Sequence, residues 1–168
     1  MKAINPQHYS YAFRLGKYDC FKVLTGKCSL ELTEKEYAYY EPLTKSYNDG
    51  SVDYCRQLAA HLTENNLFKE DTGIYAYLNA CGHVSFADGQ HRTCIAKKIG
   101  ITELTVTEFS KNEGICRVCY FKEQEKSTPI FKKLFNKIKT PPIEKFNHEE
   151  FIDDEPKEEN YFDFRRKY

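Results

Sequence analysis

The sequence predicts an α+β domain in which a mixed β-sheet is flanked by helices. Three observations lead to this fold class. Apolar residues recur at helical spacing over 52–62, two short segments rich in β-forming residues occupy 74–78 and 84–86, and a second helical pattern covers 91–99. The chain has 168 residues, of which 40% are hydrophobic, so it can bury a core within a single domain.

The first 48 residues are rich in tyrosine and have the weakest periodicity. Residues 18–24 fit either a short strand or a short helix, and residues 31–40 carry a helical pattern among acidic side chains. We therefore expect residues 1–48 to form an N-terminal extension that packs partly on the core.

The predicted core spans residues 49–125 and begins at the Asn-Asp-Gly turn signal of 48–50. Ser51 is expected to cap the helix over 52–62, because a serine hydroxyl can accept a hydrogen bond from an unpaired backbone N–H at a helix start. The apolar pattern fades at 65–66, where the helix should end.

The sheet is predicted from four short segments. Residues 79–82 are expected to turn between the strands over 74–78 and 84–86, which then form a hairpin. Alternating or β-rich patterns predict further strands over 104–109 and 115–121. The core therefore reads helix, strand, strand, helix, strand, strand.

The chain changes character near its C-terminal end. Apolar residues share one helical face among lysines over 126–140, which predicts a basic amphipathic helix that ends at a Pro-Pro pair. We expect residues 129–139 to dock on the domain or on a protein partner, with an acidic membrane surface or nucleic acid as the alternative. Residues 141–168 are highly charged and poor in aliphatic residues, which predicts a disordered tail.

Composition narrows the functional classes. No apolar run approaches the ~18 residues that span a bilayer, and the N-terminus lacks the apolar segment of a signal peptide, so we expect a cytoplasmic protein. The formal net charge is zero, which is atypical of a protein that coats DNA. Seven cysteines without a secretion signal predict reduced thiols rather than a disulfide framework.

The most informative segment is Asp88-Gly89-Gln90-His91-Arg92, the 88–92 turn, which joins a predicted strand to a predicted helix. The N-terminus of a helix presents unpaired N–H groups and a positive dipole end, both of which suit a phosphate. Gly89 permits a tight turn and Arg92 offers a planar fork for phosphate oxygens. Asp88 can cap the helix, hold a neighbouring side chain or hold a metal. The alternative interpretation is a solvent-exposed Asp-Gly turn before an amphipathic helix.

With its flanking elements, the 88–92 turn resembles the signature region of the ParB/sulfiredoxin superfamily. The similarity covers about residues 50–121 and is sharpest over 86–106, where the turn is followed by a helix with Ala96, then Gly100 and a further strand. The resemblance implies a ParB/sulfiredoxin-like fold and binding of nucleotide phosphates. It assigns this site to Gly89, Gln90, His91, Arg92 and Thr93, with Asp88, His91 and Arg92 in any catalytic role.

The resemblance implies three activities that the sequence separates in part. Sulfiredoxins use a cysteine at the position of Gln90, so sulfinic-acid reduction is not expected here. ParB partition proteins bind CTP and carry a DNA-binding helical domain, for which the chain leaves no room after residue 121. A third branch phosphorylates small hydroxyl compounds. We therefore expect ATP, ADP or CTP as ligand, with Mg²⁺, in a phosphotransferase or nucleotide hydrolase; a non-catalytic nucleotide sensor and a DNA-associated protein are the alternatives.

The sequence leaves the catalytic carboxylate and any metal ligands unidentified. Candidates for a base or metal-binding carboxylate, besides Asp88, are Asp19, Glu31, Glu36, Glu41, Asp49 and Asp53.

Two cysteine patterns also have the residue types of a metal or redox site. Cys81, His83, His91 and Cys94 have the residue types of a zinc site, but His91 is already assigned to the turn. Cys116 and Cys119 form a C-x-x-C pair; in the strand predicted over 115–121 their side chains would point to opposite faces. We therefore expect ordinary buried thiols at both places.

Overall fold

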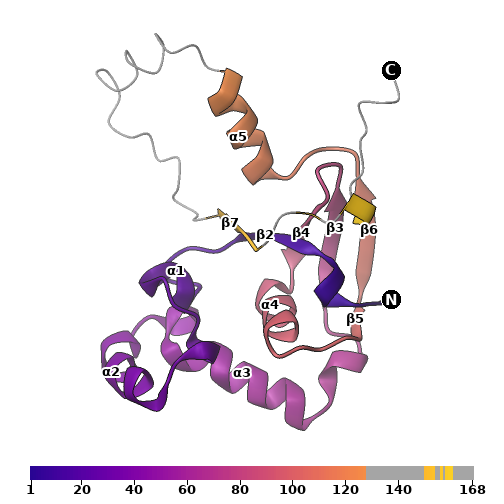
Figure 1. Ribbon diagram of the computed structural model, residues 1–168. Helices are drawn as coiled ribbons and strands as arrows, with labels where there is room; N and C mark the ends of the chain where they lie inside the picture. Colours follow the sequence, from indigo (N-terminus) through magenta and orange to yellow (C-terminus); the bar gives the residue numbers. More distant parts are fainter. Residues whose placement is uncertain (128–149, 154–155, 157, 161–168) are drawn as a thin grey trace, which may run out of the picture.

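The computed structural model describes residues 1–127, 150–153, 156 and 158–160. Within this part the chain folds into five α-helices and two β-sheets, which confirms the predicted α+β class and the mixed sheet (Figure 1). No helix in the described part is long and apolar enough to cross a membrane.

The larger sheet has five strands in the order β6-β3-β4-β2-β7. The predicted hairpin is confirmed as β3 (Tyr75–Asn79) and β4 (His83–Asp88), which pair antiparallel. On the other side of β4 lies β2 (Ser10–Arg14), which runs parallel to β4 with Ser10 opposite His83. The parallel pairing places the carboxyl ends of β2 and β4 at the same edge of the sheet.

The segment over 104–109 was predicted as a single strand, and the structure divides it. β5 (Leu104–Val106) pairs with β1 (Lys2–Ile4) in a two-stranded sheet, whereas β6 (Glu108–Asn112) pairs parallel with β3. The division falls at Thr107, where the carbonyl of Ile74 accepts from the N–H groups of both Thr107 and Glu108. This shared acceptor bends the chain from one sheet into the next.

The prediction of a strand over 115–121 is wrong. After β6 the chain forms helix α5 (Arg117–Ser127), whose first turn is closed by a hydrogen bond from the Tyr120 N–H to the Cys116 carbonyl. The β-forming residues of this segment suggested a strand, but propensity is a weak guide when tertiary contacts decide. Cys116 directly precedes the helix and Cys119 lies three residues later in its first turn, so the two share one side.

Four further helices surround the sheet. The weak patterns of the N-terminal part become α1 (Phe21–Thr25) and α2 (Glu34–Thr44), and the two stronger patterns are confirmed as α3 (Val52–Glu64) and α4 (Gln90–Lys98). Gly100 has the positive φ of 79° expected just after α4. Figure 1 shows α4 between α3 and the strands.

Ser51 precedes α3 as predicted, but its side chain makes no capping bond. The hydroxyl of Thr44, at the end of α2, accepts from the Val52 N–H at 3.0 Å instead. The start of α3 is therefore satisfied by a residue from the preceding helix, which also ties the two helices together.

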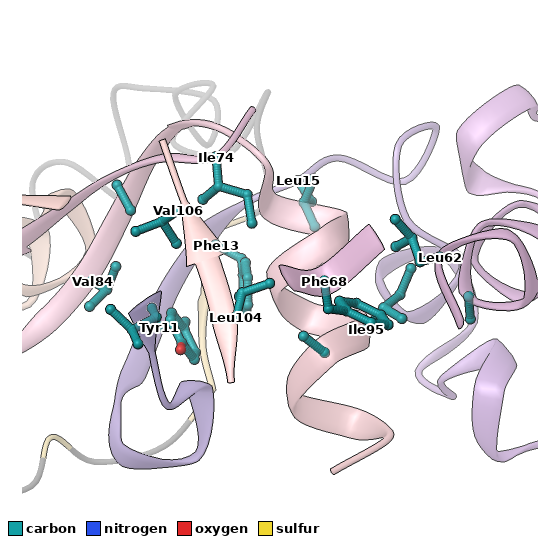
Figure 2. Packing of buried hydrophobic residues seen from close by; sticks show 14 of the residues in the cluster. Tyr11, Phe13, Leu15, Leu62, Phe68, Ile74, Val84, Ile95, Leu104 and Val106 are labelled. Atoms are coloured by element: carbon teal, nitrogen blue, oxygen red, sulfur yellow. The ribbon is translucent and has the colours of Figure 1, made fainter. Parts of the chain in front are cut away.

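The hydrophobic core lies between the sheet and α4 and continues to α3 (Figure 2). The rings of Tyr11 and Phe13 on β2 stack on Phe86 of β4, with centroids 5.7 and 5.5 Å apart. Ile95 of α4 is fully buried, and Figure 2 shows it beside Phe68. The first 48 residues thus supply a central strand and part of the main core.

Two C-terminal predictions fall largely outside the described residues. The basic helix predicted over 126–140 overlaps the described part only at the end of α5. Within the tail predicted as disordered, β7 (Glu150–Ile152) pairs antiparallel with β2, so the prediction is wrong for these three residues. Backbone pairing to an open sheet edge does not depend on the apolar side chains that the prediction was based on.

Candidate functional site

The 88–92 turn lies at the end of β4, where the strand passes directly into α4. Tyr75 of β3 pairs with Asp88 but the next residue, Ala76, pairs with Phe86, so Ala87 is an extra residue in the ladder. Such β-bulges re-aim the end of a strand and occur often beside functional sites. The bulge therefore sets the direction in which the chain leaves the sheet.

Gly89 is the N-terminal cap residue of α4 and has a φ of 88°. A Cβ atom at this position would lie 2.5 Å from Cγ1 of Ile74 and 2.9 Å from its Cα. The left-handed conformation and the close approach of Ile74, which directly precedes β3, both require glycine. This residue lets the helix begin immediately against the sheet.

The N-terminus of α4 has no side-chain cap on its first turn. Asp88 accepts a hydrogen bond from the Gly89 N–H at 2.6 Å, but the N–H groups of the following residues have no acceptor within the helix because they belong to its first turn. These groups and the positive end of the helix dipole favour an anion.

Arg92 brings a positive charge to the same end of α4. Its guanidinium lies 3.8 Å from the carboxylate of Asp88, and a Cβ on Gly73 would lie 2.9 Å from its Nη1. The side chain is about one-third exposed, at 31%. Arg92 therefore packs along the loop before β3 and still reaches solvent beside the turn.

Gln90 links the turn to β2 instead of facing outward. Its side-chain amide accepts from the Arg14 N–H at 2.6 Å and donates to the Arg14 carbonyl at 3.2 Å. These two hydrogen bonds fasten the end of β2 to the start of α4. Gln90 thus organises the turn, and its amide is already engaged.

His91 connects α4 to two other segments. Its ring lies edge-on to Tyr54 at 5.0 Å, and its Nδ1 is 3.4 Å from the sulfur of Cys55 in α3. Burial lowers the pKa of His91, whereas the carboxylates of Asp49 and Asp19 and a hydrogen bond with the Asp19 backbone oppose that shift. The neutral imidazole is therefore the favoured form at pH 7.

Two of the candidate carboxylates converge on this site. Asp19 and Asp49 act on His91, and Asp49 together with Asp88 also acts on Tyr54. The two loops that carry them are held together, because the Gly50 N–H donates to the Tyr18 carbonyl at 2.8 Å. Asp19 already accepts from the Gly16 N–H at 2.9 Å, which leaves Asp49 as the less constrained of the two acids.

The remaining candidate acids have structural partners away from the turn. Glu31 binds Lys98 at the far end of α4, and Glu36 binds Lys27 and completes the capping box of α2. Asp53 accepts from the hydroxyl of Tyr37 at 2.6 Å, and Glu41 acts on the same tyrosine. These four acids are not part of the site.

Thr93 is only 1% exposed, and its hydroxyl oxygen has no hydrogen-bond partner within the described part of the chain. The sequence predicted that this hydroxyl would join the phosphate site. Its position in the protein interior separates it from the exposed face of the turn.

A second candidate group, of three cysteines and one histidine, was not predicted from the sequence. Cys81 and His83 do lie together, but their neighbours are Cys116 and Cys119. Cys94 is on α4, where it interacts with Cys20 and Cys28. The wrong strand over 115–121 concealed this grouping, and the C-x-x-C spacing was the signal that could have found it.

Comparison of the chain with known protein families, with curated proteins and with solved structures found no match.

Proposed function

We propose that this chain binds the phosphates of a nucleotide at the N-terminus of α4, in the manner that a ParB/sulfiredoxin-like fold implies. ATP, ADP and CTP are the ligands we expect. The observation that carries the proposal is the uncapped helix end beside the Arg92 guanidinium, and the carboxylate of Asp49 acts on Tyr54 and His91 next to it. None of these features alone defines a ligand, but together they match the needs of a phosphate group and its counter-ion.

The acidic residues around the turn imply that a divalent cation accompanies the nucleotide. Asp49 and Asp88 act on Tyr54, and Asp71 interacts with Arg92 from the loop before β3. Three carboxylates near an anionic ligand would repel it unless a cation bridges them. Mg²⁺ is held in nucleotide sites by one or two carboxylates together with phosphate oxygens. We therefore expect nucleotide binding to depend on Mg²⁺.

The proposed reaction class is phosphoryl transfer to a small hydroxyl compound or to water. Such reactions depend mainly on positioning and on neutralising charge around the transferred phosphoryl group. The N–H groups of α4 and Arg92 would neutralise that charge, while Asp49 would hold the cation or accept the proton of the attacking hydroxyl. Gln90 and His91 would keep the three segments in register.

Isothermal titration of the full chain with ATP, ADP and CTP, with and without Mg²⁺, tests the proposal. Arg92→Ala should weaken binding by about 1.5–3 kcal/mol, or roughly 10- to 150-fold, the range for a charge-assisted hydrogen bond. Lys98→Ala is the matched control, because Lys98 lies at the other end of the same helix and binds Glu31. Equal affinities for the two variants would remove Arg92 from the site.

Asp49→Asn separates binding from turnover. We expect this variant to lose Mg²⁺-dependent phosphate release or transfer, and Asp53→Asn, in the first turn of α3, to retain it. Nucleotide binding by the wild type without any turnover would leave a nucleotide sensor. No binding of any nucleotide with Mg²⁺ present would refute the proposal.

A further inference from the structure

Four metal-binding side chains meet at the end of the sheet opposite to the 88–92 turn. Cys81 lies in the turn between β3 and β4, and His83 is the first residue of β4. Cys116 directly precedes α5 and Cys119 lies in its first turn. One ligand atom from each residue lies within 4.8 Å of all the others. Figure 1 shows the start of α5 beside the turn of the β3–β4 hairpin.

The distances within this Cys/His cluster fit a tetrahedral zinc site. Zn–S bonds of about 2.3 Å and Zn–N bonds of about 2.0–2.1 Å at tetrahedral angles require sulfur and nitrogen ligands to be about 3.6 Å apart. His83 Nδ1 lies 3.4 Å from the sulfur of Cys119 and 3.8 Å from that of Cys116. Small shifts of the side chains would bring both pairs to the required separation.

Backbone groups around the cluster favour thiolate ligands. The Cys116 N–H donates to the sulfur of Cys81 at 3.2 Å, and the Cys119 N–H donates to the sulfur of Cys116 at 3.4 Å. Hydrogen bonds to a sulfur stabilise its negative charge, and outer contacts of this kind orient metal ligands. Two of the three cysteines therefore already have the surroundings of a bound thiolate.

Burial also distinguishes this cluster from a surface group of cysteines. Cys81, His83 and Cys116 are 8%, 3% and 2% exposed. His83 Nε2 is buried and has no hydrogen-bond partner within the described residues, so the ring is held there through the contacts of its Nδ1 with the sulfurs of Cys116 and Cys119. A metal ligated through Nδ1 would bind the ring at the nitrogen that already faces these two sulfurs.

Among the described residues, the hydrophobic contacts between the start of α5 and the hairpin are few. The second core cluster contains three buried residues, Ala12, Cys81 and Cys116. Ile115, Val118 and Cys119 are only partly buried against it. A metal bound to two residues of the hairpin and two at the start of α5 would join segments that are 33 or more positions apart in the chain.

We propose that Cys81, His83, Cys116 and Cys119 bind a single zinc ion in a closed, structural site. Four protein ligands of the Cys₃His type leave no position for substrate or water, which is characteristic of structural zinc. The ion fixes the start of α5 onto the β3–β4 hairpin. The site is independent of the proposed nucleotide site, because β4 separates the two by about 17 Å, five steps of roughly 3.4 Å.

Elemental analysis of the full chain, purified without chelators, is the first test. We expect stoichiometric zinc, released only when the thiols are blocked or a strong chelator is added. Replacement of the zinc by Co²⁺ should give the visible absorption of a tetrahedral ion with thiolate charge-transfer bands. A metal-free protein with free thiols and no cobalt spectrum would overturn the proposal, as would a Cys116–Cys119 disulfide in the purified chain.

Variants assign the ligands. Cys119→Ser should weaken zinc binding by more than the ~10–100-fold cost of losing an outer contact. Cys28→Ser is the matched control, because Cys28 is a half-buried free cysteine outside the cluster, and it should retain full zinc. Zinc retained by Cys119→Ser, or lost equally by both variants, would refute the assignment. If Cys119→Ser does not fold, the zinc content and cobalt spectrum of the wild type still decide whether the site exists.

Discussion

Replacement of Gly89 by alanine should destabilise the protein much more than the same replacement at Gly100. Both glycines have positive φ, 88° and 79°, so both alanine variants bear the cost of a left-handed backbone, about 1–2 kcal/mol. The two sites differ in space. A Cβ on Gly89 would lie 2.5 Å from Cγ1 of Ile74, whereas a Cβ on Gly100 would meet no atom within 4 Å.

The difference between the two variants isolates the contact with Ile74, directly before β3. Ile74 is fully buried, and the clash also involves its Cα at 2.9 Å, so a side-chain rotation does not relieve it. Overpacking of this kind costs about 1–3 kcal/mol. We expect Gly100→Ala to lower the free energy of unfolding by about 1–2 kcal/mol and Gly89→Ala by about 2–5 kcal/mol. Urea titration of both variants measures this, and equal losses would refute the close packing of the turn on Ile74.

Three further predictions concern side chains whose environment the structure defines. Thr93→Val should leave stability unchanged or raise it by about 1 kcal/mol, since it removes a buried hydroxyl that has no partner in the described part. A loss of about 2 kcal/mol or more in urea titration would show that the hydroxyl is hydrogen-bonded. Burial lowers the pKa of His91, so the folded state resists its protonation and the free energy of unfolding should fall as the pH drops below about 6.5. His91→Gln should flatten this part of the profile of stability against pH, and an unchanged slope would contradict the prediction. The hydrogen bond from Lys27 is the largest cause that lowers the pKa of Glu36 to about 2. The stability that the Glu36 carboxylate contributes is therefore present above about pH 4.5 and is lost as the pH falls to about 2. Carboxyl NMR should show the pKa of Glu36 rising in Lys27→Ala.

The elements that the sequence predicted well are those whose signal is local. The apolar residues of α3 recur every three or four positions, and the β3–β4 hairpin is closed by a short turn. α4 begins beside a glycine and ends before another, and both have the positive φ that only glycine adopts easily. In each case the residues that determine the element lie within it or next to it.

The position of β2 could not be predicted from its own residues. β2 has five residues, four of them buried, and it lacks the polar alternation of a half-exposed strand. Its partner β4 is about seventy residues away in the chain, as the pairing of Ser10 with His83 shows. A short parallel pairing of this kind has no local turn signal, so the N-terminal segment resembled an extension.

The candidate site was predicted only in part, because some of its residues lie far apart in the sequence. The 88–92 turn is contiguous, so its residue types indicated a helix end suited to an anion. Asp19 and Asp49 come from two separate loops, which the packing of Gly50 against the backbone of Lys17 and Tyr18 helps to bring together. Before folding, these two acids are indistinguishable from Glu31 or Glu36.

β4 links the two candidate sites of the molecule. Its first residue, His83, belongs to the Cys/His cluster, and its last, Asp88, begins the turn. Between them the strand pairs with β3 on one side and β2 on the other, so it cannot slide without breaking hydrogen bonds to both neighbours. The bulge at Ala87 then sets where Gly89 meets Ile74. The geometry of the turn is thus imposed by the pairing of the whole strand, which is why an Asp-Gly sequence alone is a weak indicator of a binding site.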